Sequence, residues 1–424
     1  MNENRFFKLL NEYVYVSTPI RDPRHLKGRS KELKDISNCL RTMGQLPFVY
    51  GLRGVGKSSI ALTAAINIFS NDPHYVVCDS SMRFEDIIQS IIDLHTRKDI
   101  TAAHIEVESQ IDGSVKIGGS GVGGSRVERK SFTNTLGPLN VQQACVILAS
   151  IKLEDRCIVV DEFDQIKDND TRYKCALLAK ALSDSNNNTK IIFCGVANDL
   201  SDLFDRHESA SRYLRPIEVR KLDYGAIEAV IKDIEQAFGI EFEINSARRI
   251  IQISDGFPYF VHSIARETLQ CWFDDGAEFK RTTPDQYERG ILRASDTAEP
   301  ELRKIYDLAT MKYKRDGEYI CWALADGPSI YKQRTKFYSD YKEIWERAAG
   351  VCDKIDDMPK MLSLDQFSAR LTHLIKPEFG ALMFRPTKSY YELTEKRMRG
   401  YARLRAATQR VYLKPDHPLA SRQS

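Results

Sequence analysis

The stretch that most constrains the fold is a glycine-containing loop between an apolar run and a helix-like segment. Residues 46–50 are apolar, residues 51–58 match the pattern G-x-x-x-x-G-K-S, and a second apolar run begins at residue 60. Strand, loop and helix in this order form a phosphate cradle, because the glycines let backbone N–H groups face one concavity and the helix adds its positive end. The alternative is an ordinary glycine-rich turn before a helix. We expect nucleotide phosphates to be bound by Gly51, Gly54, Val55, Gly56, Lys57, Ser58 and Ser59.

Another apolar run, farther along the chain at residues 157–160, ends in the acidic pair Asp161 and Glu162. Buried parallel strands are continuous apolar runs, and ligand-binding groups lie at their carboxyl ends. Lys57 can reach the β- and γ-phosphates, and the Ser58 hydroxyl can bind Mg²⁺ together with Asp161. Glu162 is the candidate base that polarises the attacking water. Loop and acidic pair together predict an ATP and Mg²⁺ site.

Two further positions are candidates for catalysis. Residues 190–196 predict another buried strand, and Asn198, just after it, could hold the lytic water; the alternative is a helix cap for the next segment. Arg212 precedes a later strand and could reach the nucleotide of a neighbouring subunit, with Arg215 as the second choice. Either arginine could instead form a surface ion pair.

With 424 residues, the chain is long enough for two or three domains, and its fold class is expected to be α/β. We expect an N-terminal arm, whose residues around Ile20 either line a base pocket or simply pack. Helical periodicity follows residue 223, and a helix, two short strands and a last helix near the C-terminus are typical of a winged helix. The expected boundaries are an arm at 1–27, a P-loop core with parallel sheet at 28–222 with a β-hairpin insertion at about 104–130, a helical lid at 223–290, a winged-helix domain at 297–407 and a basic tail at 408–424.

Cysteines and charge bear on location and partners. The nine cysteines include no C-x-x-C pair, which argues against zinc or a redox dithiol. Several lie in apolar runs, as free thiols do in a reducing cytosol, and no apolar run has the length of a membrane span, so we expect a cytoplasmic protein. Residues 376–424 contain eleven Lys and Arg against four acids. That basic end could contact duplex DNA, or it could simply be a solvated surface.

Taken together, these motifs resemble the AAA+ ATPases, most closely the origin-recognition-complex-like initiator branch and the related prokaryotic STAND-type ATPases. The resemblance rests on the P-loop, the acidic pair and a Gly28-Arg29…Glu32-Leu33 box that in such families helps frame the adenine. It implies catalytic roles for Glu162 and for Asn198 as sensor 1, a trans-acting finger at Arg212, and oligomers.

One departure from the initiator pattern leaves two functional hypotheses for this chain. Initiator ATPases usually carry an arginine in the lid, three residues after a glycine, and this chain has Tyr259 at that position. The segment Gly256-Phe257-Pro258 instead resembles the G-x-P motif of STAND ATPases. In those proteins the proline of the motif, here Pro258, lies near the adenine. The first hypothesis is an oligomeric ATPase that couples ATP state to DNA binding or remodelling. The second is a nucleotide-dependent switch that recruits a protein effector, for example in prokaryotic defence. A GTP-binding protein is disfavoured, because a guanine-reading N-K-x-D motif is missing from a plausible place.

Overall fold

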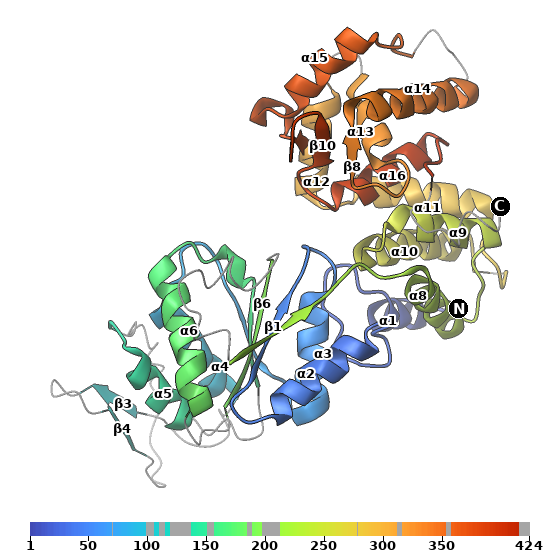
Figure 1. The fold of residues 1–424 in the computed structure, drawn as a ribbon. Coiled ribbons are helices and arrows are strands. Elements are labelled where there is room, and N and C mark those ends of the chain that lie inside the picture. Colours follow the sequence, from blue (N-terminus) through green and yellow to red (C-terminus); the bar gives the residue numbers. More distant parts are fainter. Residues whose placement is uncertain are drawn as a thin grey trace, which may run out of the picture. The chain divides into compact units, whose positions relative to one another are not determined.

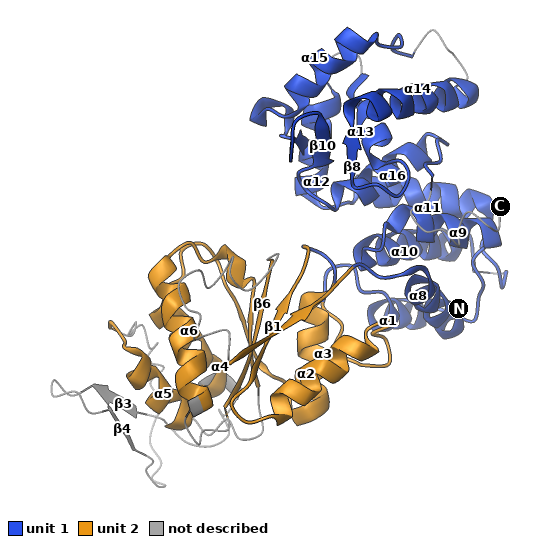
Figure 2. Cartoon of the chain, in the orientation of Figure 1, with its two compact units in different colours: residues 1–18, 53–55, 221–424 blue, residues 19–52, 56–220 orange. Residues whose placement is uncertain are grey.

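The computed structural model describes residues 1–69, 71–98, 106–109, 115–118, 137–150, 157–184, 189–196, 213–277, 279–311, 316–352 and 358–414 (Figure 1). These residues form two compact units, which Figure 2 distinguishes by colour. The core unit contains residues 19–52 and 56–220, and the helical unit contains residues 1–18, 53–55 and 221–424. We describe each unit separately.

The core unit is built on a five-stranded parallel sheet with the strand order β2-β5-β6-β1-β7. The strands are β1 (Leu46–Tyr50), β2 (His74–Val77), β5 (Cys157–Asp161), β6 (Lys190–Gly195) and β7 (Leu214–Glu218). Every residue of β5 is buried, and the first four residues of β1 are buried. Such continuous burial is typical of parallel strands covered on both faces, so the predicted α/β sheet is confirmed.

Helices cover both faces of this sheet (Figure 1). They are α2 (Ser30–Arg41), α3 (Lys57–Phe69), α4 (Phe84–Lys98), α5 (Val141–Ser150) and α6 (Asn169–Asp184), with a short 3₁₀ turn η1 (Phe163–Gln165) after β5. Helix α2 packs on α3, and α5 packs on α6. One hydrophobic core joins α4, α5 and α6 to the sheet through fully buried residues such as Phe48, Ile88, Leu148 and Phe193.

The predicted insertion contains a two-stranded antiparallel hairpin, β3 (Glu106–Ser109) with β4 (Val115–Gly118). The rest of residues 104–130 lies outside the described part of the chain.

After the core unit, the chain forms the four helices of the predicted lid: α8 (Tyr224–Phe238), α9 (Ile244–Ser254), α10 (Pro258–Asp274) and α11 (Pro284–Asp296). The N-terminal helix α1 (Glu3–Tyr13) belongs to the same unit and packs against α8. Phe6 of α1 is fully buried and stacks on Phe273, with 4.2 Å between ring centroids. The apolar face of α1 therefore has its partner in the lid.

The C-terminal part of the helical unit has the element order of a winged helix. It contains α12 (Pro300–Thr310), α13 (Asp316–Ala325), β8 (Tyr331–Gln333), α14 (Arg334–Val351), α15 (Leu364–Leu374), η5 (Pro377–Phe379), β9 (Met383–Phe384), β10 (Tyr390–Leu393) and α16 (Met398–Thr408). The predicted pair β9 and β10 is antiparallel, and β8, which the sequence did not reveal, adds a third strand beside β10. Among the described helices, none is both long and apolar enough for a membrane span.

Candidate functional site

The predicted phosphate loop follows β1, and its first residue, Gly51, lies very close to the backbone of Val219. A Cβ built on Gly51 would lie 2.3 Å from the carbonyl oxygen of Val219, so only glycine fits there. Gly54 and Gly56 have φ of 79° and 96°, in the left-handed region that favours glycine. A Cβ on Gly56 would meet no atom within 4 Å, which means that the loop has open space beside this residue. Helix α3 begins directly afterwards, at Lys57.

The side chain of Lys57 lies over the loop. Its Nζ donates hydrogen bonds to the carbonyls of Gly51 and Leu52, at 3.1 and 2.9 Å, and only 9% of the residue is exposed. Burial lowers the pKa of Lys57, and nearby acidic groups, including Asp161, act in the opposite direction. The loop therefore holds a desolvated cation, the kind of group that attracts an anionic ligand strongly.

The two acidic residues at the end of β5 have different environments. Asp161 is 3% exposed, whereas Glu162 is exposed. Glu162 has a φ of 52°, which is unusual for a residue with a side chain, and its N–H donates to Oδ1 of Asp161 at 2.8 Å. This left-handed turn lets one carboxylate stay buried while the next faces solvent.

The sheet places the loop and the acidic pair at the same edge. Strand β6 lies between β1 and β5, all three are parallel, and the carboxyl ends of parallel strands meet at one edge of a sheet. Lys57, Asp161 and Glu162 are also close enough for both acids to influence the pKa of the lysine. The structure therefore gathers the predicted phosphate-binding and acidic residues in one place.

Two residues of this edge were missed by the sequence analysis. The hydroxyl of Tyr75, on β2, donates to Oδ2 of Asp161 at 2.7 Å. Oδ1 of Asp164 accepts from the N–H of Val196 at 2.7 Å, which ties the end of β6 to the turn after β5. Asp164 could have been noticed in the run DEFD. Tyr75 could not, because its role depends on which strand lies beside β5.

Ser59 and the N-terminal arm meet at the start of α3. The Ser59 hydroxyl accepts from the N–H of Ile20 at 3.0 Å, and Thr63 donates to the Ile20 carbonyl at 3.0 Å. Ile20 is therefore fixed beside the phosphate loop, which is where a residue that lines a base pocket would lie. In the box at the start of α2, Arg29 is buried and pairs with Glu32 at 3.3 Å.

The donors at this edge suit Mg²⁺. A serine hydroxyl and a buried carboxylate are hard oxygen ligands, and Mg²⁺ is usually held by one or two protein ligands plus phosphate oxygens and waters. No cluster of three or more His, Cys, Asp or Glu that could hold a metal occurs among the residues described. Because Ser58 and Asp161 supply only two oxygen ligands, they suit a metal whose other ligands are phosphate oxygens and waters.

Other predicted site residues lie elsewhere. Asn198 and Arg212 fall outside the described residues, so their roles stay predictions. Arg215 is an exposed residue of β7, paired in register with Pro47. In the helical unit, Pro258 is the first residue of α10, and the hydroxyl of Tyr259 accepts from the N–H of Glu299 at 3.1 Å.

The break before α10 is tightly packed. A Cβ on Gly256 would lie 2.7 Å from Cβ of Lys221, and Phe257 is fully buried. Asp255 has a φ of 51°, and its buried carboxylate pairs with Lys221 at 2.5 Å and with Arg399 of α16 at 3.2 Å. Within the helical unit this motif therefore joins the lid to the C-terminal helix.

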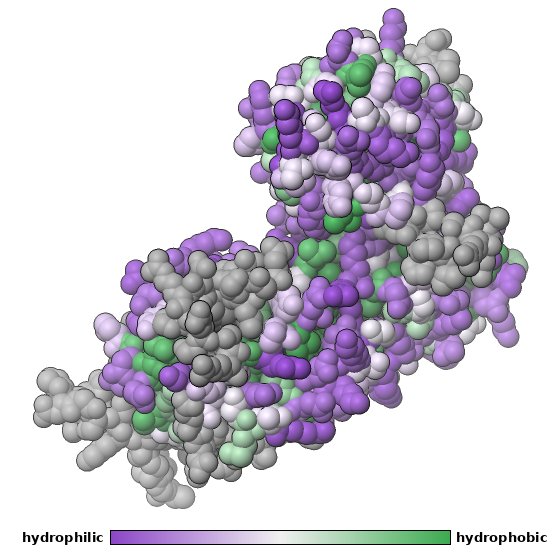
Figure 3. Space-filling view, viewed as in Figure 1, coloured by the Kyte–Doolittle hydropathy of each residue, from purple (hydrophilic) through white to green (hydrophobic). Residues whose placement is uncertain are grey.

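Helix α15, which precedes the strands β9 and β10 of the winged-helix region, presents few cations. Arg370 donates to Asp316 at 2.8 Å and is partly buried, and His373 stacks on Phe379. The exposed positions of α15 carry neither lysine nor arginine: Leu364, Asp365, Gln366, Ala369 and Thr372. The surface of this C-terminal domain that Figure 3 shows is mostly hydrophilic.

Three arginines at or just before α16 point inward. Arg399 contacts the carbonyl of Gly327 as well as Asp255, and Arg403 donates to the carbonyls of Gln252 and Gly327 at 3.1 and 3.3 Å. Both arginines are at most 5% exposed. Arg397, just before α16, is also buried and pairs with Glu299 and Glu395. These cations connect parts of the helical unit instead of forming a basic surface.

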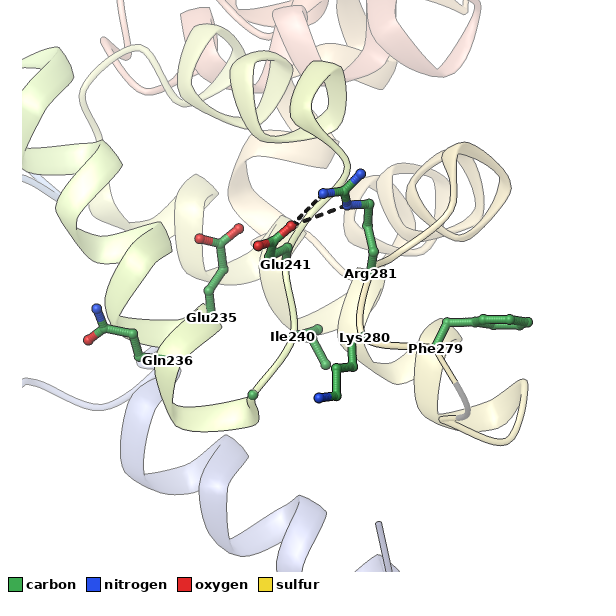
Figure 4. A pocket seen from close by; sticks show the side chains of 8 residues that line it. Glu235, Gln236, Ile240, Glu241, Phe279, Lys280 and Arg281 are labelled. Atoms are coloured by element: carbon green, nitrogen blue, oxygen red, sulfur yellow. Dashed lines mark hydrogen bonds and ion pairs between the residues drawn. The ribbon is translucent and has the colours of Figure 1, made fainter.

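A surface pocket of about 630 Å³ lies in the lid, between the end of α8 and residues 279–281 (Figure 4). Its wall carries both signs of charge, and Glu241 pairs with Arg281 at 2.6 Å across it. None of its lining residues belongs to the phosphate loop or to the acidic pair, and we assign it no role. The lining residues are Glu235, Gln236, Gly239, Ile240, Glu241, Phe279, Lys280 and Arg281.

No protein-family model matches the sequence, and no curated protein matches it. Solved structures do match. The Walker-type ATPase of Pyrococcus abyssi is similar with a TM-score of 0.53 at 14% identity, over 91% of this chain and 99% of that one. The ORC2 protein of Aeropyrum pernix, solved as ADPNP and ADP complexes, has a TM-score of 0.48 at 12% identity, over 95% and 98%. The likeness to the first structure shows that the two chains share a fold, which confirms the predicted α/β fold class.

Proposed function

Because the chain has the fold of a Walker-type ATPase, we propose that it binds ATP and hydrolyses it to ADP and phosphate. One observation carries this proposal: a buried lysine in a glycine loop and an acidic pair lie at the same edge of one parallel sheet. A desolvated cation beside backbone N–H groups suits the phosphates, and an exposed carboxylate suits activation of a water.

Each residue has a defined part in the reaction. The loop amides and Lys57 neutralise phosphate charge, and Glu162 accepts a proton from the attacking water as it adds to the γ-phosphorus. Ser58 and Asp161 are the residues that would hold Mg²⁺, which when bound neutralises charge on phosphate oxygens. Asn198 is proposed to orient the water, Arg212 to act on a neighbouring subunit's ATP, and Pro258 to lie near the adenine.

The charges favour a nucleotide-dependent switch over a DNA-loading motor. Duplex DNA binding relies on accessible lysine and arginine. Here α15 exposes none, and Arg397, Arg399 and Arg403 are buried. The exposed cations Arg385 and Lys388, between β9 and β10, are the main basic groups of the wing. We therefore propose that ATP state controls contact with a protein effector or a second copy of this chain, in the cytoplasm, with DNA as the alternative partner.

The proposal is tested by Lys57→Ala with isothermal titration calorimetry. Loss of charge-assisted hydrogen bonds worth about 1.5–3 kcal/mol should weaken ATP binding by about 10- to 150-fold. Lys34→Ala is the matched control, because Lys34 is an exposed lysine of α2 in the same unit. Unchanged ATP affinity in a folded Lys57→Ala protein would overturn the phosphate site.

A further inference from the structure

The hydroxyl of Tyr75 contacts one of the two side chains that we expect to hold Mg²⁺. It donates to Oδ2 of the buried Asp161 carboxylate at 2.7 Å. A protonated phenolic hydroxyl is a directional hydrogen-bond donor, so it can fix the orientation of the carboxylate that it contacts. We propose that Tyr75 is a positioning residue that sets the Mg²⁺ dependence of nucleotide binding, an inference that rests on the proposed ATP site.

The carboxylate of Asp161 is held at both oxygens. Oδ1 accepts from the N–H of Glu162 at 2.8 Å, and Oδ2 accepts from Tyr75. The first contact belongs to the local turn and comes from the adjoining residue. The second comes from another strand, because β2 pairs in parallel with β5, so Tyr75 fixes the carboxylate from a separate part of the sheet.

The surroundings of Tyr75 keep the hydroxyl protonated. The residue is half-buried, and burial together with the neighbouring Asp161 carboxylate raises the pKa of Tyr75 well above its ordinary value. It therefore remains a hydrogen-bond donor over the whole physiological range. Carboxylate ligands of metals are commonly oriented by such outer partners, and mutation of these partners weakens metal affinity by about 10- to 100-fold.

The test compares Tyr75→Phe with the wild type in fluorescence titrations of a labelled ADP, with Mg²⁺ varied and with EDTA. We expect the Mg²⁺ concentration that gives half of the affinity gain to rise by about 10- to 100-fold. Affinity in EDTA should stay the same, because the phosphate loop is intact. Tyr173→Phe, at an exposed tyrosine of α6, controls for loss of a hydroxyl elsewhere in the unit.

The outcomes separate this inference from the ATP site itself. If Tyr75→Phe keeps the wild-type Mg²⁺ dependence, or loses affinity equally in EDTA, Tyr75 does not position the metal ligands and the inference is overturned. If the wild type binds no nucleotide under any condition, the proposed function fails instead.

A second variant covers the case in which Tyr75→Phe does not fold. Site-specific 4-fluorophenylalanine at position 75 keeps the ring and fills the space of the hydroxyl, but it cannot donate to Asp161. The Mg²⁺ concentration that gives half of the affinity gain should rise by about 10- to 100-fold, as for Tyr75→Phe. A wild-type Mg²⁺ dependence in this variant would contradict the proposal.

Discussion

The edge of the core sheet and helix α16 both gather charged side chains, but they use them in opposite ways. At the sheet edge, Glu162 is exposed and the space beside Gly56 is open, so the charges can act on something that is not part of the chain. On α16, Arg399 and Arg403 are buried against a carboxylate and main-chain carbonyls. Burial and the kind of partner, rather than the number of charges, therefore decide whether a charged cluster binds a ligand or stabilises the fold.

The largest expected effect is on hydrolysis, at Glu162→Gln. The amide keeps the shape of the side chain but cannot accept the proton, so we expect kcat to fall by about 10²- to 10⁴-fold with ATP affinity retained. Phosphate release and calorimetry measure the two quantities. Asp170→Asn, at an exposed acid of α6, is the control. Wild-type turnover in Glu162→Gln would show that the exposed carboxylate is not the base.

The next effect is on stability, at Arg399→Met. Removing this guanidinium takes away one of the cations that pair with the buried carboxylate of Asp255, while the ion pair with Lys221 at 2.5 Å stays, and this should cost about 3 kcal/mol. We expect a clear fall in the Tm of the helical unit by calorimetry and unchanged ATP affinity below that temperature.

Arg410→Met is the matched control for Arg399→Met. Arg410 pairs with Glu288 at 3.2 Å, but both side chains are exposed, so the loss should be at most about 1 kcal/mol. Equal Tm shifts in the two variants would mean that burial does not distinguish these arginines, and the comparison above would fail.

The smallest expected effect is that of reversing the two exposed charges of the wing, Arg385→Glu with Lys388→Glu. Surface substitutions of this kind usually change stability by less than about 0.5 kcal/mol. We expect duplex DNA to bind the wild type only with the weak, salt-dependent affinity of non-specific contacts, with Kd of about 10⁻⁴ to 10⁻⁶ M. Tight binding that the double reversal abolishes, measured by fluorescence anisotropy at two salt concentrations, would favour the DNA-loading function instead.

The sequence was sufficient for the parts of the site that are continuous in the chain. The glycine loop, Lys57 and the acidic pair each follow an apolar strand, and a parallel sheet makes such runs easy to recognise. Tyr75 could not be predicted, because its contact with Asp161 depends on the pairing of β2 with β5. Asn198 and Arg212 stay predictions, since they lie outside the described residues.

The structural role of the lysines and arginines near the C-terminus could not be predicted either. A count of lysine and arginine does not say which of them face inward, and the buried partners lie far away in the chain, as Asp255 does for Arg399. The short strand β8 was missed because three residues carry too little periodicity to be recognised, although β8 completes the sheet of the winged-helix region.

The contacts of α16 have a practical consequence for dividing the protein. A fragment that stops at residue 296 would keep the Asp255 carboxylate but lose Arg399, which pairs with it. It would also keep the Gln252 carbonyl but lose Arg403, which donates a hydrogen bond to it. Such a fragment would expose the apolar side of α9 and α11 that α16 covers. The lid and the C-terminal helix should therefore be expressed, cut and crystallised as a single piece.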